Sequence, residues 1–297
     1  MLKKLWHKMY QPSYPNHPYL VYVKSRILHL IESIGGSKYK SDFEGVHSFC
    51  LFIGHGRTGS SLIGSLIDAH PNIIIAHELN PYDSIIEDIS KEALFFRLLA
   101  RSNWFSRKGA EWTGYDYSVP TQHKGKFERL RVIGDKSAGA TTKYLSSQKS
   151  LIKKIHKTVQ IPIKFIHVKR NPLDNISTYS QKSFDEEWSE DVVDKAISHY
   201  FDECERVRNI RGDIDNLEYT TWKTVYIEDF VNNTQNELYS VLDFLDEEAS
   251  REYIADCERK VFNKPNRSRE DVEFTKDQTK IIKSNMEKYQ TLERYLD

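Results

Sequence analysis

The sequence predicts an α/β fold with three layers, in which a central, mainly parallel sheet is flanked by helices as in P-loop-like proteins. Two observations support this prediction. Short apolar runs of strand length alternate along the chain with longer segments whose apolar residues recur at helical spacing. The first apolar run also leads directly into a turn rich in glycine and hydroxyl residues, which a helical pattern follows. Strands separated by helices form parallel sheets, and ligands bind at the carboxyl ends of their strands.

Five segments are expected to be strands because they are short, apolar and bounded by turn-forming or polar residues: 48–54, 72–76, 130–133, 162–168 and 223–227. Helices are expected where the apolar spacing is helical: 20–34, 59–69, 84–101, 140–157, 172–180, 187–210, 234–245, 248–259 and 275–295. Proline supports two of these boundaries. Pro71 follows the helix over 59–69, and Pro172 occupies the first turn of the helix that it opens. The late lysines of 140–157 suit the negative end of a helix dipole.

Residues 102–129 show little periodicity and are rich in aromatic side chains, including Trp104, Phe105, Trp112, Tyr115 and Tyr117. A loop of this length within a compact domain is either functional or mobile. We expect it to bind a substrate, although a flap that only covers the core would show the same composition.

The charge balance argues against a general nucleic-acid-binding protein, because Lys+Arg and Asp+Glu both number 43. Three widely spaced cysteines show neither a disulfide framework nor zinc-ligand spacing. The N-terminal residues lack the unbroken apolar core of a signal peptide, and no apolar run is long enough to span a membrane. We therefore expect a cytoplasmic protein.

The turn after the first strand has the spacing Gly54-x-x-x-x-Gly59-Ser60-Ser61, which nearly matches a nucleoside triphosphate loop. Backbone N–H groups at the following helix N-terminus bind anions. The lysine that would reach the β- and γ-phosphates is missing, because Ser60 stands in its place and the nearest cation is Arg57. The loop is therefore expected to hold a 5′-phosphate of a nucleotide other than ATP or GTP.

A second anion-binding pair follows the fourth predicted strand. Arg170 comes directly after this strand, and Thr178 lies eight residues later, about two helical turns away. Either residue alone would be an ordinary surface or helix residue. Together they would bind a second anionic group at the edge of the sheet where ligands are expected.

These two segments resemble the paired signatures of the sulfotransferase superfamily, which uses 3′-phosphoadenosine 5′-phosphosulfate (PAPS) as donor. The motif is closest to the protein-tyrosine and bacterial branch. The resemblance implies that the loop holds the 5′-phosphosulfate through Arg57, Thr58, Gly59, Ser60 and Ser61. It implies that Arg170 and Thr178 hold the 3′-phosphate. It also implies a single catalytic domain over 1–297, with a helical extension at 1–47 and a catalytic core at 48–297.

The resemblance further implies the catalytic groups. Glu78, 21 residues after Arg57, would be the base that takes a proton from the acceptor hydroxyl or amine, with His55 and His77 as rival bases. Arg57 and Lys136 would stabilise the group in transfer, without a metal. A basic segment near the C-terminus resembles, more loosely, the part of the family that covers the donor: Lys264, Arg267 and Arg269. The acceptor would be a small molecule, a glycan or a peptide, and its identity and the oligomeric state stay open.

Two other functions remain open at this point. A P-loop kinase or NTPase would need the missing loop lysine and a magnesium-binding aspartate, for which Asp135 is the only candidate after a short apolar run. A non-catalytic nucleotide-binding module would be favoured if Glu78 and Lys136 pointed away from the cleft.

Overall fold

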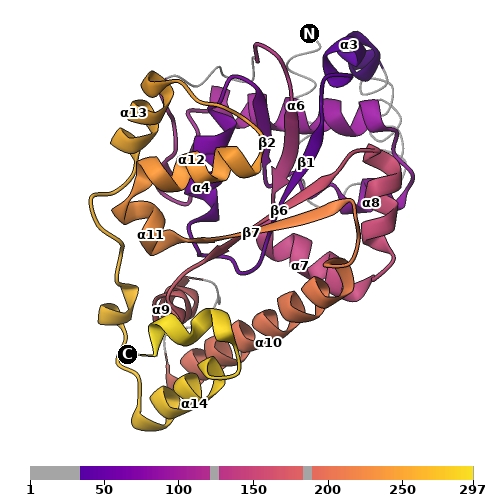
Figure 1. Cartoon of the computed structure of the whole chain (residues 1–297). Helices are drawn as coiled ribbons and strands as arrows, with labels where there is room; N and C mark the ends of the chain where they lie inside the picture. Colours follow the sequence, from indigo (N-terminus) through magenta and orange to yellow (C-terminus); the bar gives the residue numbers. More distant parts are fainter. Residues whose placement is uncertain (1–33, 121–126, 183–188, 297) are drawn as a thin grey trace, which may run out of the picture.

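The computed structural model describes residues 34–120, 127–182 and 189–296, which build a parallel sheet covered by helices (Figure 1). The helix expected over 20–34 lies outside the described residues except for its last position. All five expected strands are present: β1 (Ser48–Ile53), β2 (Ile73–His77), β5 (Val132–Lys136), β6 (Ile163–Lys169) and β7 (Thr220–Tyr226). The predicted fold class is therefore confirmed.

The strand order places β1 at the centre of the sheet and creates the crevice in which a ligand can bind. The order is β2-β5-β1-β6-β7, and every neighbouring pair is parallel. The chain moves from β1 to one side of the sheet through β2 and β5, and then to the other side through β6 and β7. The connections after β1 and β6 therefore diverge at a topological switch point, where open α/β sheets bind ligands.

The strands read as continuous apolar runs because helices cover both faces of the sheet. Along β1, Phe49 and Leu51 belong to one core cluster, whereas Cys50 and Phe52 belong to the other, as the alternation of a strand requires. The first cluster includes residues of α6 (Lys91–Arg107), α8 (Leu151–Val159) and α10 (Glu190–Ile214). The second includes residues of α4 (Ser60–Asp68), α12 (Thr234–Phe244) and α13 (Arg251–Lys260). A third cluster joins α9 (Pro172–Lys182), α10 and α14 (Lys276–Met286).

Several expected helices are interrupted in the structure. The segment 84–101 is wrong as one helix: α5 (Tyr82–Ile86) ends before Ser90, whose side chain caps α6 by accepting from the Ala93 N–H. The segment 140–157 divides into α7 (Ala138–Ser147) and α8. Ser146 and Ser147 at this break donate to carbonyls three residues earlier, and such bonds compete with the helical ladder. The segment 275–295 divides into α14 and a 3₁₀ helix, η2 (Gln290–Tyr295).

Smaller elements complete the description. A short helix, α3 (Lys40–Phe43), precedes β1, and another 3₁₀ helix, η1 (Ser268–Asp271), precedes α14. Ile227 was expected in the fifth strand but opens α11 (Ile227–Asn232), where Glu228 and Asp229 fall in the first turn and suit the positive end of the helix dipole.

The segment 102–129 is partly regular, so its prediction as a loop is wrong at two places. Helix α6 continues to Arg107, and a short hairpin follows, formed by β3 (Glu111–Trp112) and β4 (Tyr115–Asp116). Residues 121–126 lie outside the described part of the chain.

The state of the cysteines and the character of the helices can be read directly from the structure. Cys50, Cys204 and Cys257 are all buried free thiols. Within the described ranges, none of the helices combines the length and the apolar character that a membrane crossing requires.

Replacement of Gly134 in β5 by alanine should strongly destabilise the fold. Gly134 pairs with Cys50 on β1, and an added Cβ would overlap the Cys50 carbonyl oxygen. We expect Gly134→Ala to cost roughly 3 kcal/mol of unfolding free energy, because the central backbone must move. Urea denaturation measures this. Gly212→Ala is the matched control, because Gly212 lies in α10 with nothing within 4 Å of an added Cβ and should gain up to about 1 kcal/mol. Equal stability of the two variants would contradict the packing described here.

Candidate active site

The loop between β1 and α4 is shaped for close approach of an anion. Gly54 and Gly59 have φ values of 110° and 88°, in the region that favours glycine. Gly59 directly precedes α4, and a Cβ on it would lie 2.6 Å from the Ile227 Cδ1 atom. The first N–H groups of a helix have no intrahelical acceptor, so those of Ser60 and Ser61 are available to an anion in the adjoining cavity.

The loop is held in place by side chains from two neighbouring helices. The Gly54 N–H donates to Thr142 Oγ1 of α7 at 2.9 Å, and the Asn175 amide of α9 donates to the Gly56 carbonyl at 2.9 Å. Arg57 adopts a left-handed φ of 62°, a conformation that persists only where the surroundings fix it. Contacts with α7 and α9 therefore hold the loop in this conformation.

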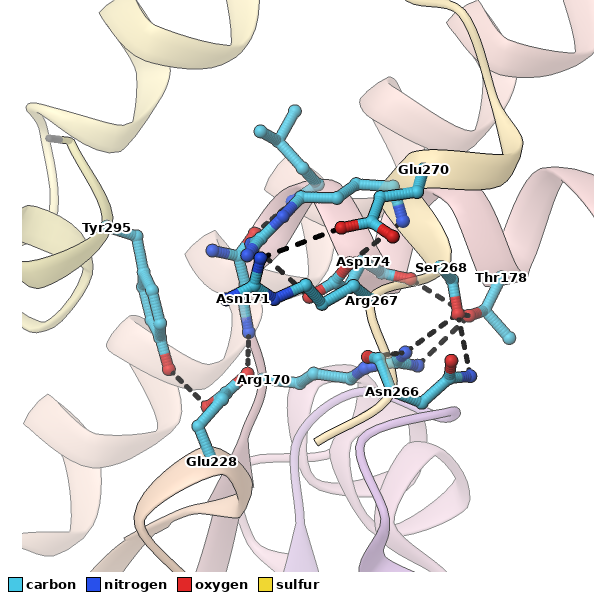
Figure 2. A network of polar contacts seen from close by, with 12 residues as sticks. Arg170, Asn171, Asp174, Thr178, Glu228, Asn266, Arg267, Ser268, Glu270 and Tyr295 are labelled. Carbon is cyan, nitrogen blue, oxygen red and sulfur yellow. Dashed lines mark hydrogen bonds and ion pairs between the residues drawn. The ribbon is translucent and has the colours of Figure 1, made fainter. Parts of the chain in front are cut away.

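Arg170 reaches both this loop and the segment expected to bind the second anion, and Figure 2 shows its contacts with the second of these. Its guanidinium donates to the Arg57 carbonyl at 3.1 Å and to Thr178 Oγ1 at 3.0 Å. It also donates to the Asn266 carbonyl at 3.0 Å and to Ser268 Oγ at 2.8 Å. Within the described residues, no carboxylate lies at ion-pair distance from Arg170, and burial lowers its pKa while the more distant Asp174 and Glu228 oppose that shift.

A cavity of about 840 Å³ opens beside these groups. The loop from Gly56 to Ser61, Arg170, Thr178 and Ser268 line it together. The two predicted anion-binding segments therefore face one cavity. Lys182 and Lys264 add positive charge to its wall, whereas Glu78, Glu228 and Asp271 add negative charge.

Glu78 reaches this cavity and forms an ion pair with Lys136. The Lys136 Nζ donates to Glu78 Oε1 at 2.7 Å and to Ser61 Oγ at 2.8 Å. The Lys136 side chain is only 2% exposed and lies behind the cavity wall, while that of Glu78 is 40% exposed. Burial lowers the pKa of Lys136, and the Glu78 carboxylate opposes this shift. One ammonium group thus touches both the carboxylate and the anion-binding loop.

Asp135 positions the turn that carries Glu78. Its buried carboxylate accepts from the Leu79 N–H at 2.8 Å and from the Asn80 N–H at 3.4 Å. Burial raises the pKa of Asp135 to about 6. The carboxylate is therefore engaged with backbone amides rather than open to a magnesium ion. Across the described ranges, no group of three or more His, Cys, Asp or Glu residues could hold a metal.

The two histidines considered as rival bases do not line the cavity. His77 is buried and stacks on Phe105 with ring centroids 3.9 Å apart, and burial lowers its pKa to about 2. The His55 Nε2 lies 2.8 Å from the Tyr200 carbonyl oxygen, which can only accept, so Nε2 carries the proton. Burial lowers the pKa of His55 to about 4. Both imidazoles are weak bases as a result.

The aromatic segment forms another wall of the cavity. Trp112, Thr113, Tyr115 and Tyr117 line it from the β3–β4 hairpin and the residues after it. Phe262 faces Tyr115 with ring centroids 6.3 Å apart, and these two side chains are 58% and 41% exposed. Exposed aromatic surface beside a polar pocket suits a ligand with an apolar or ring-shaped face.

The basic C-terminal segment contributes only part of what was expected. Lys264 lines the cavity, whereas Arg267 and Arg269 do not. Arg267 lies 3.6 Å from Glu270, and the Arg269 guanidinium lies 3.4 Å from the Asp174 carboxylate. Their arginine side chains are thus engaged with carboxylates outside the cavity.

Two residues not expected at the site, Asn266 and Ser268, contact Arg170 from about a hundred residues away in the chain. Their position within the basic segment that resembles the donor cover was the available signal. Ile227 lines the cavity beside Gly59, whereas the Tyr226 hydroxyl donates to the Thr291 carbonyl at 3.3 Å.

The buried neutral His77 should make the protein sensitive to acid. The unfolded chain binds a proton at His77 near pH 6.5, whereas the folded protein does so only near pH 2, so stability falls as the pH falls between these values. From pH 7.5 to pH 5 this loss is on the order of 2 kcal/mol. In urea denaturation at both pH values, His77→Gln should lose less stability than the parent protein by about that amount. An identical pH dependence would mean that His77 does not titrate as described.

Several solved structures resemble this chain at low sequence identity. The sulfotransferase domain of the Synechococcus PCC 7002 olefin synthase is 14% identical with a TM-score of 0.44, covering 85% of this chain and 86% of that chain. Sulfotransferase STF9 from Mycobacterium avium is 10% identical with a TM-score of 0.47, and the match covers 87% of this chain and 81% of that chain. A mouse sulfotransferase complexed with PAP is 13% identical with a TM-score of 0.44, covering 84% and 88%. No curated protein matches the sequence.

The sequence model of the sulfotransferase family matches residues 51–251. This range contains the loop after β1, the Glu78–Lys136 pair and the Arg170–Thr178 pair. Because the match spans more than half of the chain and includes the groups that meet at the cavity, the protein belongs to the sulfotransferase family and is an enzyme of sulfuryl transfer.

Proposed function

We propose that the enzyme takes its sulfuryl group from PAPS and transfers it to a hydroxyl or amine of an acceptor bound against the aromatic wall. The observation that carries this proposal is the position of Arg170. Its guanidinium contacts the loop carbonyl of Arg57 and the Thr178 hydroxyl, so groups suited to two separate phosphates face one cavity. A nucleotide with phosphates on both the 5′ and the 3′ position matches this arrangement.

The residues at the cavity fit such a donor. Thr58, Gly59, Ser60 and Ser61 would hold the 5′-phosphosulfate through backbone N–H groups and hydroxyls. Arg170, Thr178 and Ser268 would hold the 3′-phosphate, which would replace some of the protein acceptors that the guanidinium contacts here. The volume of about 840 Å³ is in the range of ligand sites, roughly 300–1,000 Å³. Lys264 can add charge from the basic segment, whereas Arg267 and Arg269 would have to leave their carboxylate partners first.

This arrangement favours sulfuryl transfer over the alternatives. The loop has no lysine to reach a γ-phosphate, and Asp135 is occupied by the amides of Leu79 and Asn80. A kinase or NTPase would need a loop lysine for its triphosphate and a free aspartate for its metal ion. A non-catalytic binding module is disfavoured because Glu78 lines the cavity and Lys136, from behind the cavity wall, donates to the Glu78 carboxylate.

The proposed chemistry rests on three charged side chains. The donor supplies a sulfuryl group joined to phosphate, which leaves as the acceptor oxygen or nitrogen attacks. Glu78 would take the acceptor proton, because it is the carboxylate at the cavity next to the loop. As Glu78 becomes neutral, Lys136 loses its counter-charge, and its ammonium then favours the negative charge that develops near Ser61. Arg57 would contribute a second positive charge from within the loop.

The acceptor would lie between Glu78 and the aromatic side chains. Trp112, Tyr115 and Phe262 offer apolar faces on which a phenol, a sugar or another ring can pack. Small molecules, glycans and peptides all contain suitable groups.

Adenosine 3′,5′-bisphosphate (PAP) should stabilise the enzyme, while ATP with magnesium should not. A ligand at a hundred times its dissociation constant adds about 2.7 kcal/mol to the unfolding free energy, which thermal denaturation detects.

Arg170→Met should weaken PAP binding tenfold or more, because a charged hydrogen bond contributes about 1.5–3 kcal/mol. The control Lys149→Met changes an exposed lysine paired with Asp213 and should bind normally. Equal stabilisation by both nucleotides would instead favour a phosphate-loop kinase or NTPase.

Glu78→Gln should reduce turnover far more than donor affinity. General-base catalysis contributes roughly 10²–10⁴-fold, so kcat should fall by this factor while the dissociation constant of PAP stays within about threefold. Steady-state assays with labelled donor and calorimetric titration of PAP measure the two quantities. Glu228→Gln is the matched control, because Glu228 lines the same cavity but accepts from the Asn171 N–H at 2.7 Å. Glu78 is not the base if Glu78→Gln turns over at the rate of this control.

A further inference from the structure

A second, smaller cavity lies behind the donor loop, between the end of β6, α10 and the residues after α14. Its volume is about 190 Å³. Five cationic side chains line it, and none of its lining residues is Asp or Glu: Lys169, Arg170, Arg208, Arg211 and Lys288. Thr58 and Arg170 line both this cavity and the larger one. The proposed chemistry of sulfuryl transfer uses none of the other four cations.

Lys169 is the central cation of this cavity. Its Nζ donates to Thr291 Oγ1, and no carboxylate within the described ranges lies at ion-pair distance from it. The pKa of Lys169 is lowered to about 8, mainly by burial, with repulsion from Arg211 as a smaller cause in the same direction. A buried cation without a counter-charge is costly, and an anion in the cavity would supply that charge.

The remaining cations have acidic partners only outside the cavity. Arg208 pairs with Glu205 at 2.5 Å and Arg211 pairs with Asp215 at 3.2 Å, and neither acid lines the cavity. Lys288 is exposed and donates to the Asn285 side-chain oxygen at 2.8 Å. Their charges therefore reach the cavity incompletely neutralised.

One residue that lines the cavity has a buried nitrogen with no hydrogen-bond partner among the described residues. His167 is buried at the end of β6, and its Nε2 has no hydrogen-bond partner within the described residues. Trp222, whose ring lies edge-on to that of His167, lines the same cavity with an unpartnered Nε1. An N–H donor and several cations around a small volume suit an oxyanion.

We propose that this cavity binds a small tetrahedral oxyanion of the phosphate or sulfate class, held mainly by Lys169 with Arg211 and Lys288. The volume exceeds that of a single oxyanion and leaves room for a few waters. The site is distinct from the donor cavity in its main cations, because Lys169, Arg211 and Lys288 line only the smaller cavity, whereas Thr58 and Arg170 line both.

The test titrates inorganic phosphate into the full-length protein while saturating PAP fills the donor cavity and chloride keeps the ionic strength constant. Phosphate binding is followed by ³¹P NMR. The wild-type protein should bind one phosphate, and sulfate should compete for it. Lys169→Met should weaken phosphate binding at least tenfold, since hydrogen bonds to charged groups contribute about 1.5–3 kcal/mol. Lys149→Met is the control, because Lys149 is exposed, pairs with Asp213 and lines neither cavity, so phosphate affinity should stay unchanged.

A second variant guards against misfolding of Lys169→Met. Lys288 is exposed, so Lys288→Met should fold normally and weaken phosphate binding several-fold. The proposal is overturned if PAP-saturated protein binds no phosphate, or if folded Lys169→Met and Lys288→Met both bind phosphate as tightly as the wild type. Calorimetric titration of PAP tests the donor site separately. Absence of phosphate binding in the PAP-saturated protein would therefore overturn only the second site.

Discussion

The hydrogen bond from Arg170 to the Arg57 carbonyl is the interaction on which the candidate active site depends. It links the connection after β1 to the connection after β6 across the switch point of the sheet. The same guanidinium also contacts Thr178, Asn266 and Ser268, so one side chain joins the donor loop, α9 and the segment before α14. This fixes the separation of the two anion-binding segments before any ligand arrives, which lowers the entropic cost of binding.

The register of the sheet makes this contact possible. Ile53 at the end of β1 pairs with His167 of β6, so both loops start at nearly the same level. The buried strands also support local strain around the cavity. Arg57, Glu78 and Asn80 all have left-handed φ values between 53° and 62°, a conformation that costs free energy for residues other than glycine. Asp135 stabilises this geometry by accepting from the amides after Glu78. Backbone strain thus gathers where the chemistry is proposed.

Sequence reasoning succeeded where the signal is local. The glycine loop, the five strands and the spacing of Arg170 and Thr178 each depend on residues close together in the chain. Contacts across long separations could not be predicted in this way. Ser268 joins Arg170 only because the C-terminal segment folds back over α9. His77 is buried against Phe105 of α6, and this burial keeps its imidazole neutral. The contact could not be foreseen while residues 102–129 were predicted to form a loop.

Two neighbouring cations at the end of β6 differ in the cavities that they line. Lys169 and Arg170 stand together in the sequence, where they suggest a single basic patch. Lys169 donates to Thr291 Oγ1 and lines only the smaller cavity. Arg170, the residue just after the strand, contacts Thr178 and lines both cavities. Burying a lysine there, with no carboxylate to balance it among the residues the structure describes, opposes folding. That cost persists in the fold unless an anion relieves it, and Arg170 and Thr58, which line both cavities, would place such an anion next to the donor site.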